Sequence, residues 1–179
     1  MINTTKSVPL GARVFTRDED GKTQPVFSGE LFDNKRVVIF SLPGAFTPTC
    51  SSRHLPEYDQ LYDQIIDTAI DEVYCISVND HFTMSAWFDS LDISNVEMVA
   101  DGNGEFTRAM GMLCTKNNTG LGDRSWRYSA VVDNGYIDAI FVENYWPTMR
   151  MDEFEGDPFE VSDANTMLEY LQGELINES

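Results

Sequence analysis

Cys50 stands near the end of a constrained stretch, PGAFTPTCSS, which runs from Pro43 to Ser52. An ionised thiol is a strong nucleophile, so this position is a candidate for covalent chemistry. Thr47 stands three residues earlier, and its hydroxyl would cap the turn or donate a hydrogen bond to the sulfur. Pro43 and Pro48 restrict the backbone on either side of that threonine. These residue types and spacings predict a preorganised thiol site.

The elements that flank this stretch would position the thiol. The run RVVIF at 36–40 is short, β-branched and unbroken, which predicts a buried strand. Apolar residues from Leu55 to Ala69 recur at helical spacing and predict an amphipathic helix. Cys50 would then lie in the first turn of that helix, where unpaired backbone N–H groups and the helix dipole favour a thiolate. In open α/β sheets, sites also form at the carboxyl ends of strands.

The remaining pattern predicts a layered α/β fold in one domain, 1–179. Asn79 or Asp80 would cap one further helix, and Ser162 or Asp163 would cap the last one. A mixed central sheet flanked by helices is expected, because strands and helices alternate before a hairpin. The expected elements are strands at 73–78, 96–100, 127–132 and 136–142, helices at 82–91 and 164–171, and an acidic loop at 143–161.

Composition excludes several classes of function. The net charge is −18, from 12 Lys and Arg against 30 Asp and Glu, so nucleic acids and anionic membranes are not expected partners. No apolar run reaches the roughly 20 residues of a membrane span, and no secretory signal is present, so the expected location is cytoplasmic. The 3 cysteines and 2 histidines form no paired ligand motif, and we expect neither a metal nor a cofactor.

Three strings of the sequence carry a resemblance to a known family. They are PGAFTPTCSSRHLP at 43–56, ISVND at 76–80 and RYSAVVDNG at 127–135. Together they resemble the type-five peroxiredoxins, and the similarity extends roughly from Val8 to Leu171. The resemblance implies a thioredoxin-like fold and thiol-dependent reduction of hydrogen peroxide and of small organic hydroperoxides. It implies Cys50 as the nucleophile, Thr47 and Arg127 as the groups that bind and polarise peroxide, and Pro43 as the shield of the sulfur.

This chemistry needs more than an ionised thiol. A free thiol with a pKa of about 8.5 is roughly 3% thiolate at pH 7, so full ionisation raises the rate only about 30-fold. Donors must also stabilise the hydroxide that departs as the O–O bond breaks. We predict that Arg127 supplies this positive charge. Arg53, three residues after Cys50, is a second candidate, and a surface ion pair is its alternative role.

Attack on peroxide would leave Cys50 as a sulfenic acid, which another thiol must reduce. No cysteine follows Cys114, and the sequence is similar to bacterial members that are fused to a glutaredoxin domain. The resemblance therefore implies a one-cysteine cycle with glutathione as co-substrate, with or without a separate glutaredoxin as partner. The alternative is a two-cysteine cycle that Cys75 or Cys114 resolves. Both cysteines would otherwise be structural core residues.

Other functions and an assembly remain open at this stage. The same sulfenic acid would serve a peroxide sensor or a relay that passes oxidation to a partner protein. His54 stands four residues after Cys50 and would suit a Cys–His hydrolase, although no local protease signature is present. The resemblance implies a homodimer whose interface lies near the active-site turn. Phe46 and Trp87 would suit that interface, and core positions would explain them equally well.

Overall fold

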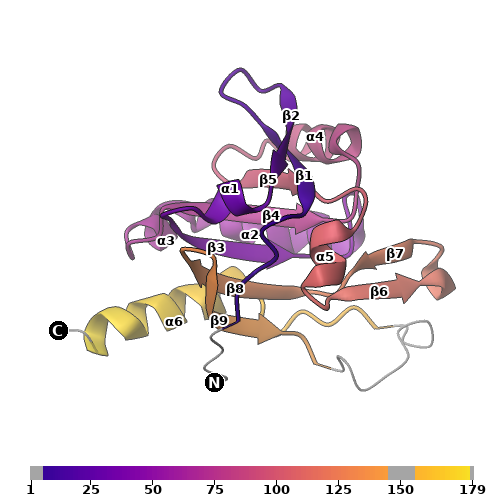
Figure 1. Ribbon diagram of the computed structural model, residues 1–179. Helices are drawn as coiled ribbons and strands as arrows, with labels where there is room; N and C mark the ends of the chain where they lie inside the picture. Colours follow the sequence, from indigo (N-terminus) through magenta and orange to yellow (C-terminus); the bar gives the residue numbers. More distant parts are fainter. Residues whose placement is uncertain (1–5, 145–155, 178–179) are drawn as a thin grey trace.

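The computed structural model describes residues 6–144 and 156–177. Its centre is a seven-stranded sheet with the strand order β2-β1-β5-β4-β3-β8-β9, and β6 and β7 form a separate hairpin that projects beside α5 (Figure 1). The strands are β1 (Arg13–Arg17), β2 (Thr23–Phe27), β3 (Arg36–Ser41), β4 (Glu72–Ser77), β5 (Glu97–Ala100), β6 (Leu113–Lys116), β7 (Gly122–Ser125), β8 (Tyr128–Asp133) and β9 (Tyr136–Val142). The helices are α1 (Gly29–Phe32), α2 (Leu55–Gln60), α3 (Tyr62–Ile66), α4 (His81–Ser90), α5 (Glu105–Ala109) and α6 (Ala164–Asn177), with a π-helical turn at Cys50–His54 and a 3-10 turn at Asn117–Thr119.

The central sheet is mixed, as the sequence predicts. Strands β3, β4 and β5 run parallel, whereas β8 pairs antiparallel with β3 and β9 pairs antiparallel with β8. On the other side, β1 pairs antiparallel with both β5 and β2. The predicted thioredoxin-like α/β arrangement is therefore confirmed. The predicted strand that starts at Arg127 begins one residue later, at Tyr128.

The sheet separates two hydrophobic cores because alternate residues of a strand point to opposite faces. Val38 and Phe40 of β3 enter the first core, which contains residues of α2, α3, α4 and α6. Val37 and Ile39 enter the second core, which contains residues of α1 and α5. Both Cys50 and Cys75 lie in the first core, and Cys114 lies in the second. The three cysteines are thus divided between the two faces of the sheet.

Several elements differ from those that the sequence predicts. The helix expected from Leu55 to Ala69 is interrupted at Leu61 (φ −94°, ψ 5°), so that α2 and α3 are separate. The caps are confirmed at two aspartates: Asp80 Oδ1 accepts from Thr83 N at 2.9 Å, and Asp163 Oδ1 accepts from the N–H groups at the start of α6. The β1–β2 and β6–β7 hairpins were not predicted. The acidic loop expected at 143–161 lies partly outside the described residues.

Candidate active site

The site begins in the turn that follows β3. Ala45 N donates to Asn79 Oδ1 at 2.9 Å, which ties the turn to the loop after β4. Thr47 Oγ1 donates to Gly44 O at 2.7 Å, and Ser51 N donates to Thr47 O at 3.0 Å. Thr47 is half-buried. Its hydroxyl therefore holds the turn together in this structure, and its proton does not point at the sulfur.

Cys50 is the first residue of the π-helical turn, and none of its surface is exposed. Arg127 Nη1 donates to Cys50 Sγ at 3.6 Å, and the arginine itself is only 1% exposed. The sheet explains this approach: Tyr128 pairs with Ser41 at the end of β3, so Arg127 arrives beside the turn. Burial alone would lower the pKa of Arg127, but the charges of Cys50 and Asp157 outweigh it and raise that pKa. The guanidinium is therefore a fixed cation.

Two further groups orient the Arg127 guanidinium. Asp157 forms an ion pair with Nη2, and His54 Nδ1 accepts from Nη1 at 3.0 Å. Because arginine can only donate, His54 Nδ1 carries no proton, and Nε2–H donates to Ser162 O at 3.1 Å. Burial, and then the charge of Arg127, hold the pKa of His54 well below its ordinary value. The imidazole is thus neutral, and both of its nitrogens are engaged away from the thiol.

A buried glutamate fixes the segment that supports this histidine. Glu143 Oε1 accepts from the backbone N–H of Ser162 at 2.9 Å and from its hydroxyl at 2.7 Å. The carbonyl of Ser162 accepts from His54 and from Tyr58 Oη, the latter at 2.9 Å. Glu143 is 1% exposed. A continuous chain of hydrogen bonds therefore runs from Glu143 through Ser162 and His54 to Arg127.

A second arginine contacts the start of the same turn. Arg124 Nε donates to Leu121 O at 2.9 Å, and Nη1 donates to Pro43 O at 3.4 Å. Burial lowers the pKa of Arg124, which the nearby charge of Cys50 opposes. A Cβ atom at Gly44 would lie 2.5 Å from Arg124 Nη1, so glycine leaves the space that this guanidinium occupies. The buried Pro43 thus accepts a hydrogen bond through its carbonyl and also lines the pocket beside the turn.

The structure gathers some of the sequence-predicted residues and not others. Pro43 and Thr47 lie in the turn that leads to Cys50, and Arg127 donates to the Cys50 sulfur. Arg53 instead forms a surface ion pair with Glu57 at 3.3 Å and is 58% exposed in its side chain.

Trp87, one of two aromatic residues that would suit a dimer interface, is fully buried within the chain. Its Nε1 donates to Ser51 Oγ at 2.9 Å. It therefore belongs to the core, whereas Phe46 is 58% exposed.

Sequence reasoning missed Arg124, Asp157 and Glu143. The first stands three residues before Arg127, and the other two lie in a segment whose acidic composition conceals two carboxylates with specific partners. No spacing rule connects these residues to Cys50. In residues 6–144 and 156–177, no cluster of metal-ligating side chains occurs, and no helix is long and apolar enough to cross a membrane.

Comparisons with known proteins identify the family of the chain. The sequence profile of the family described as Redoxin matches residues 7–157. A peroxiredoxin of Synechocystis sp. is 50% identical over 157 residues, which cover 88% of this chain and 78% of that protein. Hybrid peroxiredoxin hyPrx5 of Haemophilus influenzae is 51% identical over 156 residues, which cover 87% of this chain and 61% of that protein. The crystal structure of a Plasmodium falciparum antioxidant protein, described as a 1-Cys peroxiredoxin, is 34% identical with a TM-score of 0.86 and covers 95% of this chain and 99% of that one.

The fold and the site define a thioredoxin-like protein whose buried thiol lies beside a fixed cation. The chain belongs to the peroxiredoxin family, and its activity is that of a thiol-dependent peroxidase. The resemblance seen in the sequence is therefore confirmed at the level of fold, family and reaction class.

Proposed function

We propose that Cys50 is the nucleophile of this peroxidase and that hydrogen peroxide is its substrate. The observation that carries the proposal is the 3.6 Å contact between Arg127 Nη1 and Cys50 Sγ, both buried, in a chain of net charge −18. The Cys50 thiolate attacks one oxygen of hydrogen peroxide, an S–O bond forms and the O–O bond breaks. Cys50 becomes a sulfenic acid, and the departing hydroxide takes up a proton and leaves as water.

Donors around the turn would lower the barrier to O–O cleavage. Asp157 and His54 hold the Arg127 guanidinium beside Cys50, and the carbonyls of Leu121 and Pro43 hold the Arg124 guanidinium beside the turn. Fixed cations beside a buried thiol cost little reorganisation as negative charge develops on the leaving oxygen. The Thr47 hydroxyl would turn from Gly44 O toward the peroxide, exchanging one acceptor for another. No cofactor enters this step.

The same proposal assigns a one-cysteine cycle with glutathione as reductant, with or without glutaredoxin. Burial, and then the charge of Cys50, raise the pKa of Cys75 well above its ordinary value. Burial raises the pKa of Cys114 to about 11, although Lys116 opposes the shift. Neither thiol is therefore ionised at neutral pH, and Cys114 lies in the opposite core. The Plasmodium falciparum relative, whose description is 1-Cys, supports the same cycle.

We also propose a homodimer that uses the face around the active-site turn. Phe46 follows β3 and Phe82 follows β4, and these parallel neighbours end at the same edge of the sheet. The two rings are 58% and 75% exposed. Exposed aromatic side chains of this size are typical of contact surfaces. Replacing Phe46 with Glu should convert the dimer to a monomer in sedimentation measurements, and an unchanged mass would contradict this interface.

Steady-state assays with three reductants test the proposal. Hydrogen peroxide consumption is measured with glutathione, with glutathione and glutaredoxin, and with thioredoxin. We expect many turnovers per Cys50 with glutathione, and a loss of at least about 10³-fold in Cys50→Ser, because removal of a nucleophile abolishes the covalent route. Retention of activity in Cys50→Ser would disprove the role of Cys50. A single oxidation per chain followed by disulfides to a partner protein would instead indicate a sensor or relay.

A further inference from the structure

A pocket of about 400 Å³ adjoins the turn that carries Cys50. Thr47 and Thr49 line it from the turn, and Lys116 and Leu121 line it from the β6–β7 hairpin. Asp157, the ion-pair partner of Arg127, also lines the pocket. The residues that immediately precede Cys50 therefore line a cavity that a lysine lines as well. Hydrogen peroxide is much smaller than this space, so the pocket has room for a second, larger reactant.

Lys116 is an unusual residue to find in a pocket lining. It is only 6% exposed, and its Nζ lies 5.4 Å from the centre of the Trp126 ring. In the part of the chain that the structure describes, the Lys116 ammonium forms no ion pair with a carboxylate, whereas Asp157 in the same pocket is already paired with Arg127. A buried charge is costly unless it is paired, and contact with an aromatic ring satisfies it only in part. An anionic ligand would complete the site.

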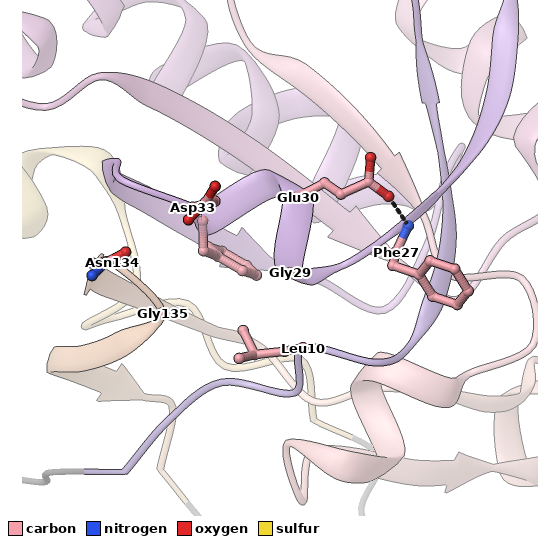
Figure 2. A pocket seen from close by; sticks show the side chains of 8 residues that line it. Leu10, Phe27, Gly29, Glu30, Asp33, Asn134 and Gly135 are labelled. Carbon is pink, nitrogen blue, oxygen red and sulfur yellow. Dashed lines mark hydrogen bonds between the residues drawn. The ribbon is translucent and has the colours of Figure 1, made fainter.

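A second pocket, drawn in Figure 2, differs from the pocket beside Cys50 in the charge of its lining residues. Its volume is about 370 Å³, close to that of the pocket beside Cys50. Glu30 and Asp33 line it, and none of its lining residues is a cation. Glu30 Oε1 accepts from Phe27 N at 2.8 Å, so the carboxylate of this lining residue is held in a fixed position. In a chain of net charge −18, a carboxylate ligand would be repelled from such a lining. Of these two pockets, the one beside Cys50 alone offers an anion a cationic side chain.

We propose that the pocket beside Cys50 binds the carboxylate-bearing thiol that reduces the sulfenic acid, and that Lys116 pairs with a carboxylate of that thiol. The inference rests on the proposed function, in which glutathione is the reductant, and adds the residue that selects it. The thiol sulfur attacks Cys50 Sγ, an S–S bond forms and the S–O bond breaks. The hydroxide leaves with the thiol proton as water. A second thiol then attacks the mixed disulfide, which releases Cys50 as a thiol and the reductant as its own disulfide.

A cycle of two changes, one in the protein and one in the ligand, tests the pairing. The sulfenic acid is formed with one equivalent of hydrogen peroxide and mixed rapidly with glutathione or with glutathione diethyl ester, which lacks both carboxylates. The second-order rate constant of mixed-disulfide formation is measured for wild type and for Lys116→Met. We expect the ratio of the glutathione to the ester rate constant to fall about tenfold in Lys116→Met, as for loss of one charge-assisted hydrogen bond. Lys116→Arg should restore most of the ratio.

The controls separate binding from folding and from overall charge. Lys22→Met removes the same charge from the exposed β1–β2 turn and should leave the ratio as in wild type. A loss in Lys116→Met that is equal for glutathione and its ester would overturn the inference, because a structural defect does not distinguish the two ligands. If wild-type sulfenic acid reacts with thioredoxin but not with glutathione, the proposed reductant is wrong and the inference fails with it. Turnover of wild type by glutathione with an unchanged ratio in Lys116→Met overturns the inference alone.

Discussion

Cys50 and Cys75 lie in the same hydrophobic core, and both are fully buried, yet their surroundings differ in one decisive respect. Cys50 follows the end of β3, where the neighbouring antiparallel strand delivers Arg127 to within 3.6 Å of the sulfur. Cys75 lies within β4, opposite Phe40, and burial followed by the charge of Cys50 raises its pKa. Burial therefore disfavours the ionised form of the Cys75 thiol, whereas Arg127 brings a fixed positive charge to the sulfur of Cys50. The comparison locates the difference in Arg127 and the groups that hold it.

Removing the positive charge of Arg127, which distinguishes Cys50 from Cys75, should have the largest effect on the rate of Cys50 oxidation. We expect Arg127→Met to lower the second-order rate constant for Cys50 oxidation by hydrogen peroxide by about 10²- to 10³-fold, because a donor to the developing hydroxide is lost. The rate is followed by stopped-flow fluorescence. Arg53→Met is the matched control. Arg53 lies in the same π-helical turn as Cys50, but it pairs with Glu57 at the surface. Equal losses in the two variants would show that the position of the cation is unimportant.

The Thr47 hydroxyl should contribute less than the cation. Thr47→Val removes both the 2.7 Å hydrogen bond to Gly44 O and the proposed donor to peroxide. We expect the oxidation rate constant to fall by about 10- to 100-fold, which corresponds to one or two hydrogen bonds. Thr47→Ser keeps the hydroxyl and should recover most of the rate. A Val variant as fast as the Ser variant would leave Thr47 with a purely structural place in the turn.

The pH dependence of stability tests whether His54 remains neutral beside Arg127. The folded state holds the pKa of His54 well below 6.5, so below pH 6.5 the unfolded chain binds a proton that the folded chain does not. Acid therefore favours unfolding, and His54 should account for about 1 kcal/mol of stability lost between pH 6.5 and 5.5. Urea unfolding at the two pH values measures this loss.

The variant His54→Gln keeps an acceptor for Arg127 without a group that titrates in this range, so its stability should fall less over the same interval. If wild type and His54→Gln lose equal stability, the folded histidine takes up the proton. The protonated His54 would then be a second cation next to Arg127 in acid. The charge around Cys50 would come from both residues, and the difference between Cys50 and Cys75 could not be assigned to Arg127 alone.

The sequence predicts the residues that are close together in the chain better than it predicts their supports. Pro43, Thr47 and Cys50 share one turn, and the strand before them is an unbroken apolar run. Arg127 was predicted as a site residue only from the resemblance to peroxiredoxin sequences, because no periodicity connects residues 77 positions apart. Glu143 acts on this site through Ser162, and such a relation depends on tertiary packing alone. Local rules cannot reveal it.

The missed hairpins have a local explanation. Strand β2 contains Pro25 and is mostly exposed, as suits an edge strand, so its sequence TQPVF lacks the apolar alternation by which strands are predicted.

The predicted helix from Leu55 to Ala69 has continuous apolar periodicity, but Leu61 departs from helical geometry. Periodicity reports which face is buried and does not report such a break.

The smallest expected effect concerns Cys75 itself. If only the thiol beside Arg127 reacts, Cys75→Ala should keep turnover with glutathione within about twofold of wild type, since the thiolate is the form that attacks and burial disfavours it. Cys114→Ala is the matched control, because that thiol lies in the second core, on the other side of the sheet. Mass spectrometry under non-reducing conditions after peroxide treatment supplies the direct measurement. A stoichiometric Cys50–Cys75 bond, together with a tenfold loss of turnover in Cys75→Ala but not in Cys114→Ala, would make the two cysteines partners in one cycle. Cys50, which lies beside Arg127, would then be the thiol that attacks peroxide, and Cys75 would be the thiol that resolves the sulfenic acid. The resolving thiol needs no neighbouring cation before the sulfenic acid has formed.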